Sequence, residues 1–241
     1  MIVLATPTRD TVTAGFTADL VKLIRRHAAT DDITLHWAAL IGIYIANLRQ
    51  YGVTLAQGMG ASHILFVDSD MRFPADTLDR LVAADKDIVA ANYVQRTAPQ
   101  WWTSRFDGEW ISSVGRTGLQ EVEAVGFGVI LIRLSVFDAL ARPWFDTPYD
   151  GQNHVGEDLY FCQQARNAGF SVWIDHDLSQ QVRHQGTVEL GVHCGVDLPS
   201  ATAIVDTETR NGVLAGEAIR RVGDRAGHGA AVYAETDDTL M

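Results

Sequence analysis

The sequence predicts an α/β protein with a mostly parallel, doubly wound sheet and helices on both faces. Two observations lead to this fold class. Segments with the period of a strand alternate with segments that have the period of an amphipathic helix, over about the first 95 residues. The chain of 241 residues is also 47% hydrophobic, which is enough for a sizeable core. Such alternation is typical of strand–helix–strand units, whose helices cover both faces of a parallel sheet.

The chain opens with two strand–helix pairs. The apolar run of residues 2–8, with its Thr-Pro-Thr end, predicts a strand. From Thr13 the apolar residues follow the helical period and end in Arg-Arg-His, which predicts a helix. Alternation over residues 33–40 predicts the second strand, and residues 44–61, closed by glycines, predict the second helix.

A third pair follows directly. Residues 63–67 predict a buried strand, and residues 73–85 predict a helix with Pro74 in its first turn. Residues 87–94 then predict another strand, which completes the alternation of the first half.

After residue 95 the sequence pattern changes to short apolar runs, glycine turns and tryptophans. We expect hairpins there, then one long strand from Val122 to Arg133 and a short helix from Ser135. Residues 156–170 predict a helix with acidic residues at its start and a glycine at its end, and residues 171–175 predict the strand after it.

Charge and composition exclude several classes of protein. A formal net charge of −11, from 19 basic and 30 acidic residues, is unfavourable for a general nucleic-acid binder. No run reaches the ~18 apolar residues of a transmembrane helix, and the first residues lack a basic signal region, so we expect a cytoplasmic protein. Cys162 and Cys194 are too few for a disulfide framework and form no C-x-x-C pair, so we expect reduced thiols.

The sequence contains three D-x-D triplets: Asp68/Asp70, Asp85/Asp87 and Asp175/Asp177. With 22 aspartates in 241 residues, chance alone gives about two. Position separates them, because ligands of doubly wound sheets bind beyond the carboxyl ends of the strands. The second triplet precedes a predicted strand and fits a solvated turn. The third follows a strand and stays a candidate for the site, while the first follows one directly and is the best placed.

Asp68 and Asp70 have two interpretations. Two carboxylates one residue apart in a turn can converge on Mg²⁺ or Mn²⁺, cations that prefer oxygen ligands. Without a cation the two charges would repel, which raises a pKa. The alternative is a helix N-cap with an Asx turn, which aspartates after strands often form.

Five segments resemble, in their order, the metal-dependent glycosyltransferases of the Rossmann-like GT-A fold, in particular the small bacterial and phage enzymes of the family-two-like group. They are ILFVDSDMRFP, DKDIVAANYVQR, AVGFGVILIRLSVFDAL, GEDLYFCQQARNAGFSVWID and VRHQG. The resemblance covers roughly residues 1–186. It implies a nucleotide-binding half, residues 1–95, and an acceptor and catalytic half, residues 96–186. Residues 187–241 would be a C-terminal extension.

The resemblance implies transfer of a sugar from a nucleotide-diphosphate sugar, a UDP- or GDP-sugar, to an acceptor hydroxyl. It implies Mn²⁺ or Mg²⁺ as cofactor, with Asp70 as direct ligand, Asp68 as a ligand or ribose contact, and His184 completing the metal site. The alternative for His184 is a surface or satisfied core histidine. A bound cation would also explain how a chain of net charge −11 binds a polyphosphate.

By the same resemblance, Asp158 would be the general base that takes the proton of the acceptor hydroxyl, and such a base implies inversion at the sugar. The stereochemistry stays open, because some retaining enzymes of the GT-A fold share the D-x-D motif and the histidine. Glu157 would position the acceptor or the base. The alternative is that both carboxylates merely complement the dipole of the predicted helix, where each is worth about 0.3–1 kcal/mol.

Further contacts to the nucleotide-sugar follow from the resemblance. They comprise Thr8, Arg9, Asp10, Arg49, Asp68, Ser69, Gly126 and Phe127. The glycines at 126 and 128 give the backbone room near the donor or acceptor, or else ease strand packing or a bulge. Trp101, Trp102 and Trp110 could stack on sugar faces, although tryptophans in a hairpin region are more often core residues.

Three other functions compete with this interpretation. A nucleotidyltransferase usually has a glycine-rich, basic loop near its N-terminus, which ATPTRDTVTAG lacks. A phosphatase of the haloacid-dehalogenase type needs Thr or Val where Arg72 stands. A non-catalytic nucleotide- or sugar-binding relative need not keep Asp70, Asp158 and His184 together.

Overall fold

The computed structural model describes residues 1–29, 32–96 and 101–186. The chain divides into two units, Met1–His184 and Gln185–Met241, and the first of them carries the fold. The predicted C-terminal extension, residues 187–241, lies outside the described residues, and so does Cys194. The division of the first unit into a nucleotide-binding half and an acceptor half stays a prediction.

Strands and helices alternate over the first half of the described chain, as the sequence predicts. In chain order the elements are β1 (Ile2–Thr8), α1 (Ala14–Ala28), β2 (Leu35–Ile41), α2 (Ile45–Gly58), β3 (His63–Val67), β4 (Met71–Arg72), α3 (Thr77–Ala83), β5 (Ile88–Ala90), β6 (Arg105–Phe106), β7 (Glu109–Trp110), β8 (Leu119–Val122), β9 (Val129–Arg133), α4 (Leu134–Asp138), α5 (Glu157–Asn167), β10 (Val172–Asp175), α6 (His176–Ser179) and β11 (Arg183–His184).

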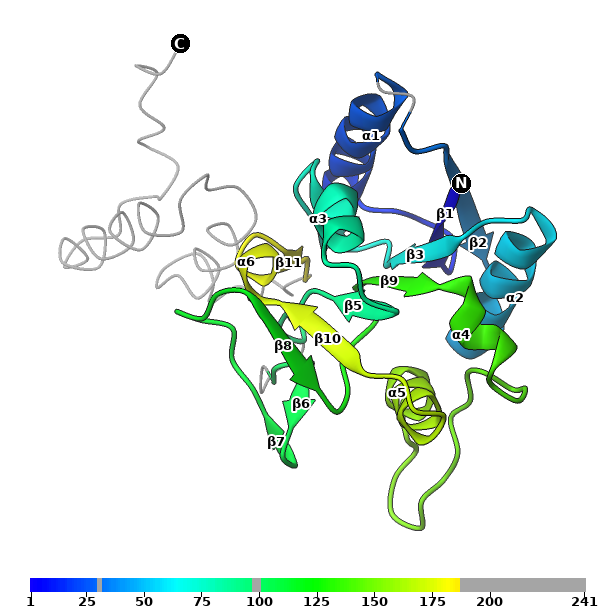
Figure 1. Cartoon of the computed structure of the whole chain (residues 1–241), viewed down its shortest axis with the longest axis vertical. Helices are drawn as coiled ribbons and strands as arrows, with labels where there is room; N and C mark the ends of the chain where they lie inside the picture. Colours follow the sequence, from blue (N-terminus) through cyan, green and yellow to red (C-terminus); the bar gives the residue numbers. More distant parts are fainter. Residues whose placement is uncertain (30–31, 97–100, 187–241) are drawn as a thin grey trace, which may run out of the picture. The chain divides into compact units, whose positions relative to one another are not determined.

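The central sheet has seven strands within the described residues, in the order β2-β1-β3-β9-β5-β10-β8. Strands β2, β1, β3, β5 and β10 run in one direction, and β9 and β8 run in the other. Figure 1 shows α1 and α3 together on one side of this sheet and α2 with α4 on the other. The predicted fold class, a doubly wound, mostly parallel α/β sheet with helices on both faces, is therefore confirmed.

Two hydrophobic cores hold the layers together, one on each face of the sheet. Successive strand residues point to opposite faces, so Val3 and Ala5 of β1 enter one core while Ile2 and Leu4 enter the other. Helices α2, α4 and α5 pack on the first core, and α1, α3 and α6 pack on the second. The strands read as apolar runs because both of their faces are covered.

The predicted long strand from Val122 to Arg133 is wrong, because the chain forms two strands there. β8 ends at Val122 and β9 begins at Val129. Between them the amide of Gly126 donates to Thr103 O at 2.9 Å, and the carbonyl of Gly128 accepts from the amide of Asp68 at 3.0 Å. These bonds direct the segment toward the end of β3. The short helix predicted to follow is α4.

The predicted place of Pro74 in the first turn of a helix is also wrong. The amide and the hydroxyl of Thr77 both donate to the carbonyl of Pro74, at 3.2 and 2.7 Å. The proline therefore belongs to a turn that precedes α3, which begins at Thr77.

None of the helices in the described part of the chain combines the length and the hydropathy needed to cross a bilayer. Cys162 is buried in the core on the side of α5 and forms no disulfide. Burial raises the pKa of its thiol to about 12. Such a thiol has little reactivity at neutral pH, because the thiolate is the reactive form.

Candidate active site

The candidate site lies where the parallel strands of the sheet end. Asp68 and Asp70 follow β3 directly. Helix α5 precedes strand β10 and runs in the opposite direction. The first turn of α5, with Glu157 and Asp158, therefore lies near the carboxyl end of β10, at the same edge of the sheet as Asp68 and Asp70. Helix α2 leads into β3 in the same way and carries Arg49 one turn from its start. This edge is the usual ligand-binding edge of a doubly wound sheet.

Asp68 and Asp70 lie in a tight turn that other elements hold in place. The amide of Met71 donates to the carbonyl of Asp68 at 3.1 Å and closes the turn. The amide of Asp68 donates to Gly128 O, and the carbonyl of Ser69 accepts from the amide of Thr13, both at 3.0 Å. The alternative of a helix N-cap does not apply, because the next helix, α3, begins farther along the chain.

Arg49 joins the two carboxylate motifs. Its Nη2 lies 3.1 and 3.3 Å from the two carboxylate oxygens of Asp68, and its Nε lies 3.0 Å from Oε1 of Glu157. The residue is 2% exposed, and its guanidinium lies 5.4 and 5.1 Å from the ring centres of Phe66 and Phe127. Arg49 is therefore buried and paired with two carboxylates, and its predicted contact with the nucleotide stays a prediction.

The charged groups of this cluster shift the pKa values of one another. Burial would lower the pKa of Arg49, but the charges of Asp68 and Glu157 outweigh burial and raise it. Burial raises the pKa of Asp68, and the neighbouring carboxylates of Asp70 and Glu157 raise it further, while Arg49 opposes the rise. Arg49 is the cation that makes this concentration of carboxylates tolerable in the fold.

Asp70 faces His184 across the turn. Oδ2 of Asp70 lies 3.3 Å from Nε2 of His184, and Nδ1 of His184 lies 3.1 Å from the carbonyl of Val94. A carbonyl can only accept, so Nδ1 carries a hydrogen and Nε2 presents its lone pair to a cation or takes a second proton. Arg96 also pairs with Asp70. Burial opposes ionisation of Asp70, but the hydrogen bond and charge of His184, with the charge of Arg96, outweigh burial and lower its pKa.

Two side chains here are suited to ligate a divalent cation. Within the described residues, no group of three His, Cys, Asp or Glu side chains is placed to hold a metal. Asp70 and His184 face each other across the turn. Both oxygens of Asp68 accept from Arg49, and its role as a further ligand stays a prediction. Mg²⁺ commonly takes one or two protein ligands together with phosphate oxygens and waters. A ligating histidine commonly donates its other N–H to a carbonyl, as His184 does. This donor set fits a divalent cation that is shared with a diphosphate.

Asp158 has the properties of a base near neutral pH. The amide of Leu159 donates to its Oδ1 at 2.8 Å. Burial, followed by the charge of Glu157, raises the pKa of Asp158 to about 6. The dipole of α5 would by itself stabilise the charged form and lower that pKa, in opposition to burial and Glu157. The role of Asp158 as a base stays a prediction. A Cβ on Gly156 would lie 2.6 Å from Oδ1 of Asp158, so the glycine leaves the space that the carboxylate occupies.

Tyr93 lies within the site, although no sequence pattern identified it. The amide of Gly128 donates to its hydroxyl at 3.0 Å, and its ring meets that of His184 edge-on, with 5.4 Å between the centres. Burial raises the pKa of Tyr93 well above its ordinary value, and the charges of Asp68 and Asp158 add to the rise. The hydroxyl therefore stays protonated at neutral pH. The signal that could have found Tyr93 is its place just past the carboxyl end of β5.

Gly126 and Gly128 give room to the ring of Tyr93. A Cβ on Gly128 would lie 2.6 Å from Cζ of Tyr93, and one on Gly126 would lie 2.6 Å from its hydroxyl oxygen. We therefore expect Gly128→Ala to lower the free energy of unfolding by about 1–3 kcal/mol, the usual cost of overpacking, in urea titrations. Gly58→Ala is the matched control, because a Cβ there meets nothing within 4 Å at the end of α2, and it should be neutral or stabilising. Equal stability of the two variants would contradict the steric role of Gly128.

Three predicted nucleotide contacts lie beside the carboxylate cluster. Thr8, Arg9 and Asp10 stand at and just beyond the end of β1, next to β3 in the sheet. The hydroxyl of Thr8 donates to the carbonyl of Thr11, and Arg9 and Asp10 are exposed. Among the described residues, no hydrogen bond or ion pair links these three to Asp68 or Asp70. Their contact with a nucleotide stays a prediction.

The aromatic residues of this region divide differently from the prediction. Phe127 is 1% exposed, and its ring packs against Phe66, so it could meet a ligand only through its backbone. Trp101 is 53% exposed and Trp110 is also exposed, so neither is a core residue, and their stacking on a sugar stays a prediction. Trp102 is half-buried.

The other two D-x-D triplets have structural partners. Asp175 is the N-cap of α6 and accepts from the amide of Leu178 at 3.0 Å, while Asp177 accepts from the amide of Gly118 at 2.8 Å. Asp85 and Asp87 pair with Arg133. Of the three triplets, Asp68/Asp70 is thus the one that the structure brings together with Glu157 and His184.

Comparisons with known proteins give evidence about the fold alone. No family model matches the sequence, and no curated protein matches it. A197 from STIV superposes with a TM-score of 0.52 at 13% identity, over 80% of this chain and 98% of that one. The catalytic domain of Drosophila β1,4-galactosyltransferase 7, in complex with xylobiose, gives 0.48 at 17% identity, over 75% and 68%. S. aureus TarS 1–349 gives 0.45 at 13%, over 76% and 60%. The likeness to A197 agrees with the α/β architecture, and no conclusion about activity rests on the two weaker superpositions.

Proposed function

We propose that this chain is a metal-dependent glycosyltransferase that moves a sugar from a nucleotide-diphosphate sugar to an acceptor hydroxyl. One observation carries the proposal: Asp68, Asp70, Glu157, Asp158 and His184, separated widely in the sequence, meet at the carboxyl edge of the sheet. A site with one carboxylate–histidine pair for a cation and a second carboxylate with a pKa of about 6 suits this reaction.

Each group has a distinct role in the proposed reaction. Asp158 takes the proton of the acceptor hydroxyl as its oxygen forms a bond to the anomeric carbon, and the bond from that carbon to the diphosphate oxygen breaks, with inversion. Asp70 and His184 would hold Mn²⁺ or Mg²⁺, which as a Lewis acid supplies charge stabilisation for the departing diphosphate. Arg49 pairs with Asp68 and Glu157 and holds both carboxylates beside the reacting groups.

A ligand screen tests the proposal directly. UDP-, GDP-, CMP- and dTDP-sugars are added to the full chain with and without Mn²⁺, and the melting temperature is measured. We expect one nucleotide class, a UDP- or GDP-sugar in particular, to stabilise the chain in a Mn²⁺-dependent way, because a ligand that binds the folded state raises its stability. Absence of any shift would contradict the proposal. Stabilisation without release of nucleoside diphosphate, over a panel of acceptor sugars, would favour a binding protein.

The pH dependence tests the role of Asp158. A base must be deprotonated, so kcat/KM should rise through an apparent pKa of about 6 and fall about tenfold per pH unit below it. Asp158→Asn should remove this limb and lower kcat by about 10²–10⁴-fold, the usual range for general base catalysis. Asp177→Asn, at the start of α6, is the matched control, and it should keep both the pH limb and the wild-type kcat. Turnover by Asp158→Asn at the wild-type rate would rule out this base.

A further inference from the structure

Asp19 is a buried carboxylate that lies outside the site. It stands on the face of α1 that packs on the sheet, among Phe16, Leu20 and Leu23, and is 5% exposed. A buried charge is costly unless it is paired and hydrogen-bonded, so its partners indicate what it holds.

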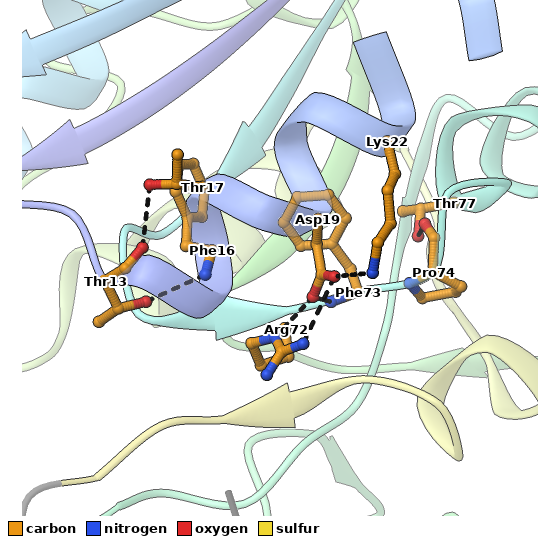
Figure 2. Close-up of polar contacts among 9 residues, drawn as sticks. All are labelled: Thr13, Phe16, Thr17, Asp19, Lys22, Arg72, Phe73, Pro74 and Thr77. Atoms are coloured by element: carbon orange, nitrogen blue, oxygen red, sulfur yellow. Dashed lines mark hydrogen bonds and ion pairs between the residues drawn. The ribbon is translucent and has the colours of Figure 1, made fainter. Parts of the chain in front are cut away.

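The partners of Asp19 lie on the segment that follows the Asp68–Asp70 turn (Figure 2). Its Oδ2 accepts from Nε of Arg72 at 2.6 Å and from the backbone amide of Phe73 at 3.3 Å. Its Oδ1 accepts from Nζ of Lys22, on the same helix, at 3.2 Å. The ring of Phe73 also packs edge-on against Phe16 of α1, with 5.9 Å between the centres. One carboxylate thus fixes both a side chain and the backbone of this segment to α1.

The same helix fixes the other side of the turn. Thr13, the N-cap of α1, accepts from the amide of Phe16 at 3.1 Å, as Figure 2 shows. The amide of Thr13 donates to the carbonyl of Ser69 at 3.0 Å. The residues between Ser69 and Phe73, with Asp70 among them, are therefore held at both ends by α1.

Strand β4, which Asp19 attaches to α1, also pairs with the strand that contains His184. Arg72 belongs to β4, and β4 pairs with β11 in the register Arg72↔Arg183 and Met71↔His184. Each of these strands has two residues, and so short a ladder has little stability of its own. Because its contacts with α1 fix the position of β4, β11 pairs with a strand that does not move. The distance of 3.3 Å between Asp70 and His184 depends on that edge.

We propose that Asp19 is a positioning residue for the metal site, and this inference rests on the proposed function. Through Arg72 and Phe73 it sets β4, and through β4 it sets the place of His184 relative to Asp70. Asp19 does not touch the ligand. Loss of a group that hydrogen-bonds directly to a metal ligand costs about 10–100-fold in metal affinity. Asp19 acts one step farther from the ligands, through β4, so we expect the lower end of that range.

A double-mutant cycle on the full chain tests this inference. Asp19→Asn keeps the shape but removes the charge and one of the two acceptor oxygens, and Arg72→Gln removes the cationic partner. The matched control is Asp79→Asn, which breaks another ion pair of α1, that between Arg26 and Asp79 of α3, away from β4 and β11. Three quantities are measured: Mn²⁺ affinity by the loss of the free-ion EPR signal, with UDP or GDP present, and, without ligand, the melting temperature and the backbone hydrogen exchange of residues 70–73 and 182–185.

We expect Asp19→Asn and Arg72→Gln each to weaken Mn²⁺ binding at least tenfold, and the double variant to weaken it no more than the worse single variant. Exchange should rise in residues 70–73 and 182–185 for these variants and stay unchanged for Asp79→Asn. A fall in melting temperature with wild-type Mn²⁺ affinity would overturn the inference, because a merely structural pair has only that effect. If the wild-type chain binds no Mn²⁺ with either nucleotide, the proposed function fails, and unchanged exchange in residues 182–185 would separately overturn the hold of Asp19 on β11.

Discussion

Replacing Arg49 by methionine should lower the free energy of unfolding by about 3–5 kcal/mol at pH 7, the usual cost of removing one partner of a buried ion pair. The variant leaves Asp68 and Glu157, which are partly buried, without their cation. The loss should be smaller at pH 5, because unpaired buried carboxyls take up protons more readily and the folded state then carries less uncompensated charge. Urea titrations at both pH values measure the two losses.

The sign of this pH effect follows from Asp68. Burial already holds the pKa of Asp68 above its ordinary value in the wild-type chain, so the folded state binds protons more readily than the unfolded state there. Stability is therefore lost as the pH rises through that range, and removal of Arg49 extends the effect. Arg80→Met is the matched control, since Arg80 pairs with Asp76 in a partly exposed place and should cost less than about 1 kcal/mol. Equal losses for both arginine variants would contradict the role of Arg49.

Asp70→Asn should abolish the Mn²⁺-dependent shift in melting temperature caused by the nucleotide-sugar, and lower turnover on the order of a thousandfold. Asparagine keeps the size of the side chain but removes the charge that faces His184 and Arg96. Charge stabilisation by a metal is worth several kcal/mol, and each 1.36 kcal/mol corresponds to about tenfold in rate. The thermal-shift screen measures the loss of Mn²⁺-dependent stabilisation, and an assay of nucleoside diphosphate release measures the loss of turnover.

The control for Asp70 comes from another D-x-D triplet. Asp85 pairs with Arg133 in an exposed place and has a φ of 49°, a conformation that asparagine also tolerates. Asp85→Asn should keep wild-type nucleotide stabilisation and turnover. If Asp70→Asn retained the Mn²⁺-dependent stabilisation, the ligand role of Asp70 would be wrong.

The fold could be predicted from the sequence because local periodicity and burial agree in its first half. Residues 2–8 and 63–67 are apolar runs since helices cover both faces of β1 and β3. The split between β8 and β9 could not be predicted, because residues 123–128 leave the sheet through hydrogen bonds to Thr103 and Asp68, which are distant in sequence. No local pattern contains such partners.

The candidate site shows the same division. Asp68, Asp70, Glu157, Asp158 and His184 could be predicted from motifs and their resemblance to a family, and the structure brings them together. The buried position of Arg49 could not be predicted, because an arginine in a helix is expected on the surface unless its carboxylate partners are known. Tyr93 and Asp19 lack a motif altogether, and their importance comes from what packs against them.

Distance along the chain gives the site a place in the order of folding. The Arg49–Glu157 bond joins residues 108 positions apart, and the Asp70–His184 contact joins residues 114 positions apart. Closing such long loops costs entropy before any contact offsets it, and folds dominated by distant pairings form slowly. The helices and the β1–β2–β3 edge can form from nearby residues, whereas the carboxylate cluster requires α5 and β11 to be in position. Under the proposed function, a chain that binds the nucleotide has α5 and β11 in position, so nucleotide binding would distinguish such molecules from compact intermediates that lack the site.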